Sequence, residues 1–170
     1  VRKVSVDQEC DILHGHFIAD SLIGIDLRSI QYIVWLRDPV DRVVSHYNYW
    51  QRNPNMNQPI CRKIAEEGLT LKEFCQIESM RDVQSFFLGK VPLKQFAFIG
   101  IQEKFQESIS KFNNIFDFNI DDDVFENYNP QAKKQSYLEL IGKDLYDFIE
   151  SQNKLDRELY LEALELMGYK

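Results

Sequence analysis

Cysteine is scarce in this chain, which has three of them, Cys10, Cys61 and Cys75, among 170 residues. They form no CxxC pair, so their spacing offers neither a disulfide framework nor the ligands of a tetrahedral zinc site. We therefore expect free or buried thiols, which are typical of a reducing compartment.

Long apolar runs are also missing. No run approaches the ~18 apolar residues of a membrane span, and no signal peptide heads the sequence. We expect no membrane segment within these residues. The sequence starts at Val1, however, so an upstream segment is compatible with it.

Positive charge is in deficit, with 20 Lys and Arg against 27 Asp and Glu, a net charge of -7 and a pI near 5.0. This balance argues against nucleic acid or an anionic membrane as a partner of the whole surface, but a local basic pocket is compatible with it. Hydrophobic residues make up 44% and charged residues 28%, as in ordinary globular proteins. The length predicts one domain over 1–170 with a substantial core.

Three short apolar runs are predicted strands: "DILH" (11–14), "QYIVWL" (31–36) and "FAFIGI" (96–101). They lack strict alternation, which is typical of strands covered on both faces of a parallel sheet. The 16 residues between the first two have room for a crossover helix and so for a right-handed βαβ unit. The predicted fold class is α/β, a parallel β-sheet flanked by helices.

Helices are predicted for most of the remainder. After the second strand, Asp38 is placed to cap a helix and Pro39 to occupy its first position. An apolar stripe at i, i+3, i+4 and i+7 follows, formed by Val40, Val43, Val44 and Tyr47. Further helices are expected at 60–67, 70–78, 81–88, 102–116, 136–150 and 154–167, with Gly68 and Gly89 as stops.

Candidate functional residues gather at the predicted carboxyl ends of the first two strands, where open α/β sheets bind their ligands. His14 and His16 end the first strand, Arg37 ends the second, and Ser45 lies two turns into the following helix on its polar side. A guanidinium, a hydroxyl and a helix N-terminus together suit a phosphate group.

A purely structural interpretation of the pair is equally open. In it, Arg37 pairs with Asp38 or Asp41, and Ser45 is an ordinary residue of the helix surface.

The turn "HGHF" (14–17) also permits more than one interpretation. Imidazole titrates near neutral pH, so a general base is the favoured functional role. A metal site would need a third ligand, and the third histidine of the chain, His46, has no spacing that supports one. The structural alternative is a core histidine bonded to a backbone carbonyl.

At these residues the chain resembles a carbohydrate sulfotransferase, closest to the heparan sulfate 2-O-sulfotransferase branch. The resemblance rests on "YIVWLRDPVDRVVSHYNYW" (32–50), with its RDPxxRxxSxY pattern, and on "LHGHF" (13–17). Supporting segments are "FAFIGIQEKFQESI" (96–109) and "LYDFIESQNKLDRELYLEAL" (145–164), so it spreads over nearly the whole chain.

The resemblance implies a co-substrate, 3′-phosphoadenosine 5′-phosphosulfate, and no metal. Arg37 and Ser45 correspond to the pair that binds its 3′-phosphate, the group that distinguishes this donor from ATP. His16 corresponds to the catalytic base and His14 to its assisting neighbour.

The loop "NPQAKKQS" (129–136) resembles the family's late loop that folds over the nucleotide, so Lys133 or Lys134 would reach it. The alternative is that both are solvated loop lysines.

The resemblance also implies a P-loop-kinase-like fold that opens with a strand, a phosphate-binding loop bearing a lysine, and a helix. "VRKVSVDQEC" (1–10) contains no glycine and cannot supply that loop. We expect the missing element upstream of Val1, and a degenerate domain is the alternative. Lumenal members of the branch carry disulfides in the middle region, whereas Cys75 has no near partner. We therefore expect a cytoplasmic and bacterial protein, or a Golgi-lumenal one if an upstream anchor exists.

The predicted function is transfer of a sulfuryl group from the nucleotide donor to a hydroxyl acceptor, a carbohydrate. The net charge of -7 favours an acceptor less charged than a long polyanionic glycan. Two alternatives remain open: a nucleotide-binding or scaffold domain without the chemistry, and a metal-dependent hydrolase using His14 and His16.

Overall fold

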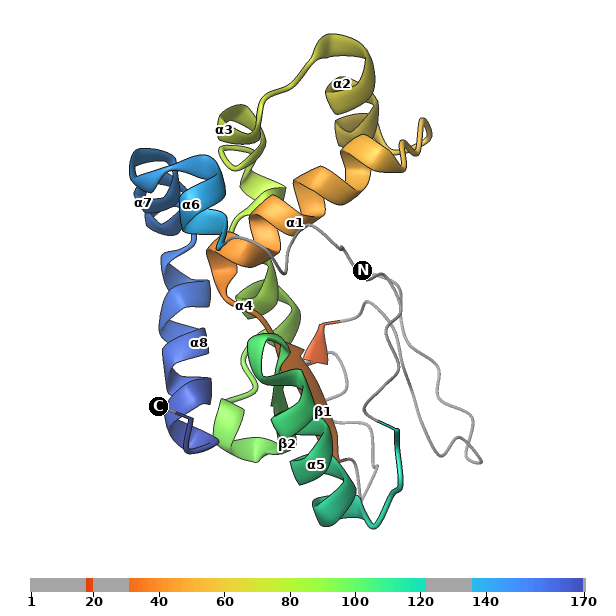
Figure 1. The fold of residues 1–170 in the computed structure, drawn as a ribbon, viewed down its shortest axis with the longest axis vertical. Coiled ribbons are helices and arrows are strands. Elements are labelled where there is room, and N and C mark those ends of the chain that lie inside the picture. Colours follow the sequence, from red (N-terminus) through yellow and green to blue (C-terminus); the bar gives the residue numbers. More distant parts are fainter. Residues whose placement is uncertain (1–17, 20–30, 122–135, 170) are drawn as a thin grey trace.

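The structure, a computed structural model, describes residues 18–19, 31–121 and 136–169. It is a mixed α/β protein, mostly helical, with a two-stranded parallel sheet (Figure 1). The strands are β1 (Tyr32–Leu36) and β2 (Phe96–Ile101). The helices are α1 (Pro39–Arg52), α2 (Pro59–Glu67), α3 (Leu71–Phe74), α4 (Val83–Leu88), α5 (Phe105–Phe116), α6 (Tyr137–Ile141), α7 (Lys143–Ser151) and α8 (Lys154–Leu166), with 3₁₀ turns η2 (Glu78–Met80), η3 (Leu93–Gln95) and η4 (Gln102–Lys104).

The sheet separates two different layers of side chains. Leu36 lies opposite Ile101 in the parallel register, and both belong to a core that includes Tyr160 of α8. Successive side chains of a strand point to opposite faces, so Trp35 and its neighbour Phe98 lie on the other face. There the aromatic rings continue onto α5, the helix that lies beside the sheet in Figure 1. The expectation of a parallel sheet flanked by helices is confirmed for these two strands, whereas full cover of both faces is not, because Ile33 and Trp35 of β1 are exposed.

Helix α1 leads from the sheet into the helical part of the protein (Figure 1). Asp38 caps it as predicted: its Oδ1 atom accepts hydrogen bonds from the backbone N–H groups of Val40 (2.9 Å) and Asp41 (3.2 Å). Pro39 occupies the first turn, where a missing N–H costs nothing.

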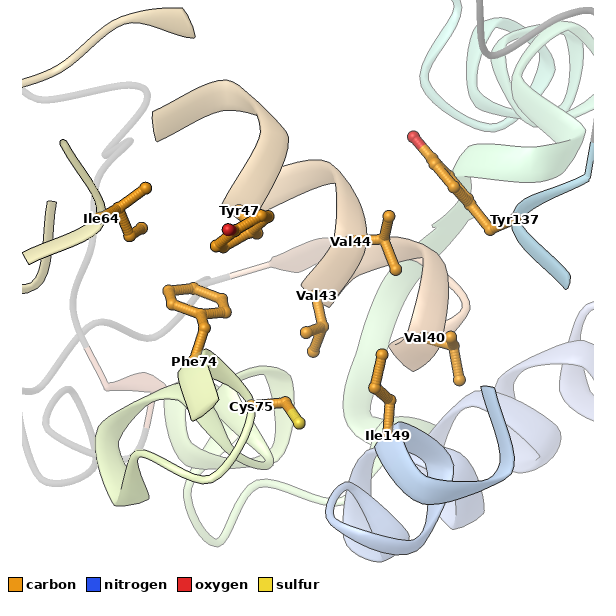
Figure 2. Close-up of a cluster of buried hydrophobic side chains, with 9 residues drawn as sticks. All are labelled: Val40, Val43, Val44, Tyr47, Ile64, Phe74, Cys75, Tyr137 and Ile149. Atoms are coloured by element: carbon orange, nitrogen blue, oxygen red, sulfur yellow. The ribbon is translucent and has the colours of Figure 1, made fainter. Parts of the chain in front are cut away.

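The predicted apolar stripe of α1 is buried and forms the centre of a second core (Figure 2). This core joins α1 to α2, α3, α6 and α7, and its buried members are Val40, Val43, Val44, Tyr47, Ile64, Phe74, Cys75, Tyr137 and Ile149. Cys61 and Cys75 are free and buried, as expected, and Cys10 lies outside the described residues. Within the described ranges, no helix has the length and apolar character needed to cross a membrane.

Several predicted boundaries are confirmed and others are wrong. Gly68 and Gly89, both at positive φ, end α2 and α4. The single helix expected at 136–150 is wrong, because Gly142 (φ 78°, ψ 158°) leaves the helical region and separates α6 from α7. The helix expected at 70–78 stops at Phe74, since the chain turns extended at Ile77. The strand expected at 11–14 lies outside the described residues.

Gly100 generates a testable prediction about the sheet. A Cβ atom at this position would overlap the indole ring of Trp35, which lies across β2 in the gap left by the absent side chain. We expect Gly100→Ala to cost about 1–3 kcal/mol through overpacking, a fall in melting temperature of about 2–4 °C per kcal/mol. Differential scanning fluorimetry measures the shift.

The matched test removes the ring. In a Trp35→Val background the added methyl group has space. The free energy of unfolding lost through Gly100→Ala should then be a small fraction of the loss in the wild-type background. An equal cost in both backgrounds would show that the indole is not what requires glycine.

Candidate functional site

The candidate site lies where both strands end. Because β1 and β2 are parallel, their carboxyl ends share one edge of the sheet, and Arg37 and η4 follow them there. The backbone N–H of Asp38 donates to Oε1 of Glu103 on η4 at 3.0 Å, and Nε of Arg37 lies 3.8 Å from the same oxygen. The predicted ligand edge is therefore occupied by a guanidinium, a helix start and a carboxylate.

The backbone of Arg37 is held by the side-chain amide of Gln84. The N–H of Arg37 donates to Oε1 of Gln84 at 2.8 Å, and Nε2 of Gln84 donates back to the Arg37 carbonyl at 2.9 Å. Gln84 belongs to α4, whose first turn donates to the buried carboxylate of Asp156 through Gln84 N–H (3.2 Å) and Ser85 N–H (2.7 Å). Asp156 thus positions the segment that fixes the Arg37 backbone.

The second arginine of the motif, Arg42, is engaged inside the protein. Its Nη2 atom donates to the carbonyl of Met80 (2.9 Å) and to Oδ1 of Asn153 (3.3 Å), and its Nε lies 3.7 Å from Oδ2 of Asp156. Burial lowers the pKa of Arg42, and the Asp156 carboxylate opposes that effect. Arg42 therefore ties α1 to α8 and is not available to a ligand.

The cap of α1 is itself anchored from α8. Nη1 of Arg157 donates to Oδ2 of Asp38 at 2.6 Å, while Nη2 of Arg157 lies 2.8 Å from Oε1 of Glu150. The hydroxyl of Tyr160 donates to Oε2 of Glu103 at 3.0 Å. Burial, together with Glu103, raises the pKa of Tyr160, so this phenol stays protonated and remains a donor.

Arg37 and Ser45 remain available in the described part of the chain. The side chain of Arg37 is 29% exposed and has an ion-pair contact to Glu103 through Nε, with the ring of Tyr137 at 6.0 Å. Its pairing differs from the structural alternative, which named Asp38 or Asp41. No side-chain hydrogen bond is found for Arg37 or Ser45 among the described residues, and Nε of Arg37 is buried without one. Ser45 is half-buried and follows Asp41 by one helical turn, on the same face.

Asp41 lies between these two residues on α1. Burial is the largest cause that raises the pKa of Asp41 to about 6, followed by the negative charge of Asp38. The positive charge of Arg37 acts in the opposite direction and lowers the pKa of Asp41.

His46 has a structural environment. Its ring lies against Trp50 (4.1 Å between centroids) and Phe74 (5.7 Å), and burial followed by the charge of Arg42 lowers the pKa of His46 to about 4. His46 is therefore a neutral imidazole that packs against aromatic rings. Over residues 18–19, 31–121 and 136–169, no cluster of three His, Cys, Asp or Glu side chains has metal-site geometry.

The other predicted site residues, His14, His16, Lys133 and Lys134, lie outside the described residues. Of the predicted site residues the structure therefore describes two: Arg37, which precedes the Asp38 cap of α1, and Ser45, in the second turn of that helix. No family model matches the chain, and neither the curated proteins nor the solved structures yielded a match.

Sequence reasoning missed the residues that build the edge: Gln84, Glu103, Asp156 and Arg157. A usable signal existed in "NKLDREL" (153–159), where Asn153 and Asp156 sit one turn apart at a helix start. Two polar residues at that spacing on a packed helix indicate a buried network. Their partners, more than 70 positions away, carry no comparable signal.

This network predicts that removing the Asp156 carboxylate greatly lowers the stability of the protein. Asp156→Ala leaves the Arg42 guanidinium and two N–H groups of α4 without their buried acceptor, so the free energy of unfolding should fall by about 3–5 kcal/mol. Urea denaturation followed by circular dichroism measures it. Glu158→Ala, on the exposed face of the same helix, is the matched control and should stay within about 0.5 kcal/mol of wild type. Equal effects of the two changes would contradict the role given to Asp156.

Proposed function

We propose that this protein is a sulfotransferase that transfers a sulfuryl group from 3′-phosphoadenosine 5′-phosphosulfate to a hydroxyl acceptor, a carbohydrate. One observation carries the proposal. Residues 37–45 contain three arginine or hydroxyl donors, and one of them, Arg42, donates its hydrogen bonds inside the protein. The terminal nitrogens of Arg37 and the hydroxyl of Ser45 have no hydrogen-bond partner in the described part of the chain. The motif thus retains two donors that packing does not explain.

These donors suit a phosphate monoester. A guanidinium binds two phosphate oxygens at once, a hydroxyl donates to a third, and the first turn of α1 adds favourable dipole charge. From the start of α1 to Ser45 the axis advances about 9 Å, which an arginine side chain and a phosphate group together span. Because the backbone of Arg37 is already held by Gln84, only its side chain has to be ordered when a ligand binds.

The two donors would hold the 3′-phosphate, the group that ATP and ADP lack. In the proposed reaction His16 removes the proton of the acceptor hydroxyl while its oxygen attacks sulfur in line. The S–O bond to the 5′-phosphate breaks, and adenosine 3′,5′-bisphosphate leaves with that electron pair. His14 would assist His16, Lys133 or Lys134 would contact the nucleotide, and the reaction needs no metal. A cytoplasmic, bacterial setting is part of the proposal.

Nucleotide binding tests the donor assignment. We expect adenosine 3′,5′-bisphosphate to bind more tightly than ADP in isothermal titration calorimetry. Arg37→Ala should weaken that binding about 10- to 100-fold, since a charge-assisted contact contributes about 1.5–3 kcal/mol. Ser45→Ala should weaken the binding several-fold. Arg52 is exposed in the last turn of α1, so Arg52→Ala should leave the affinity unchanged. Equal affinity of the wild-type protein for both nucleotides would contradict the assignment of Arg37 and Ser45 to the 3′-phosphate.

Turnover tests the catalytic assignment. His16→Ala should reduce sulfuryl transfer by about 10²–10⁴-fold while the affinity for adenosine 3′,5′-bisphosphate and the melting temperature stay unchanged. A labelled donor and a panel of mono- and oligosaccharides provide the assay. His14→Ala should reduce sulfuryl transfer less than His16→Ala does. Full transfer by the His16→Ala protein would remove this residue from the mechanism.

A further inference from the structure

Four carboxylates surround the start of α1, and three of them have defined partners. Asp38 accepts from Arg157 and from two backbone N–H groups of its own helix. Glu103 accepts from Tyr160 and from the N–H of Asp38. Glu150 pairs with the second terminal nitrogen of Arg157.

The fourth carboxylate, Asp41, has no such partner. Its backbone N–H donates to Asp38, but its carboxylate forms no hydrogen bond or ion pair within the described ranges. Five groups besides Asp38 interact electrostatically with Asp41 from the neighbouring elements: Arg37 after β1, Glu103 on η4, Tyr146 on α7, and Arg157 and Tyr160 on α8. Both cations are already engaged with other carboxylates.

A phosphate at the proposed position would lie against this carboxylate. Asp41 precedes Ser45 by four residues, which brings their Cβ atoms to about 5–6 Å on one helix face. Asp41 also lies within electrostatic range of the Arg37 guanidinium. An anion that bridges Arg37 and Ser45 therefore meets Asp41, and two negative groups in one half-buried site favour protonation of one of them.

We propose that Asp41 is a further ligand-contacting residue of the phosphate site: its carboxylate takes up one proton from solvent when the phosphate dianion binds, and the resulting carboxylic acid donates a hydrogen bond to a phosphate oxygen. This inference rests on the proposed function, because it uses the anion held by Arg37 and Ser45. It makes the site bind its ligand together with a proton.

Burial and the charges of Asp38 and Glu103 raise the pKa of Asp41 to about 6 in the free protein. A phosphate dianion against the carboxylate raises it further, because two negative charges in one half-buried site repel each other. A phosphate monoester is itself almost fully dianionic above pH 7, since its second pKa is about 6. Above pH 7, proton uptake on binding therefore reports on the protein.

Calorimetry at pH 7.5 in two buffers of different ionisation enthalpy counts the protons. We expect wild-type protein to take up close to one proton per adenosine 3′,5′-bisphosphate bound, and its affinity to fall nearly tenfold per pH unit between pH 7 and 8.5. Asp41→Asn should take up none, bind more tightly at pH 7.5, and show a flat pH profile. Glu66→Gln, at an exposed acid of α2, should behave as wild type.

The outcomes separate the two proposals. Binding of the bisphosphate in preference to ADP without proton uptake, or with equal uptake in Asp41→Asn, overturns the role of Asp41 and leaves the phosphate site standing. Equal affinity for bisphosphate and ADP overturns the phosphate site and the role of Asp41 with it. If Asp41→Asn does not fold, Asp41→Ala replaces it, and a proton uptake equal to that of wild type overturns the role of Asp41.

Discussion

The buried carboxylate of Asp156 is the interaction on which the arrangement of this protein depends. It is fully buried, receives two backbone N–H groups from α4, and faces the guanidinium of Arg42 on α1. One side chain of α8 thus fixes the relative positions of α1, α4 and α8. Because an unpaired charge in the interior is costly, separation of these elements is unfavourable. The Arg37 backbone, held by Gln84 in the first turn of α4, inherits this rigidity.

The motif after β1 therefore contains side chains that hydrogen-bond within the fold and side chains that form no hydrogen bond in the described part of the chain. Asp38 caps α1, and Arg42 belongs to the buried network. The hydroxyl of Tyr47 donates to the Leu69 carbonyl at 2.8 Å. A pattern of this kind indicates a strand-to-helix junction first and a ligand second. Under the proposed function, the ligand contacts of the pattern are left to Arg37 and Ser45.

Local signals explain which features were predictable from sequence. The two strands, the Asp38 cap, the apolar stripe of α1 and the stops at Gly68 and Gly89 depend on neighbouring residues, and the structure confirms them. Gly142 was misjudged, because amphipathic spacing on both sides of it continues as if through one helix. The surroundings of Arg37 depend on Gln84 and Glu103, 47 and 66 positions further on, and pairwise spacing carries no information about contacts at that range.

The dependence of the sheet edge on α8 has a consequence for biosynthesis. Domains fold as units while the chain emerges from the ribosome, and α8 follows every other described element in chain order. Until it emerges, the Asp38 carboxylate lacks Arg157, and the Arg42 guanidinium, which still reaches the Met80 carbonyl, lacks Asn153 and Asp156. A nascent chain that ends before α8 would therefore carry β1 and α1 without their anchors. The sheet edge would reach the arrangement seen in the structure only after α8 docks.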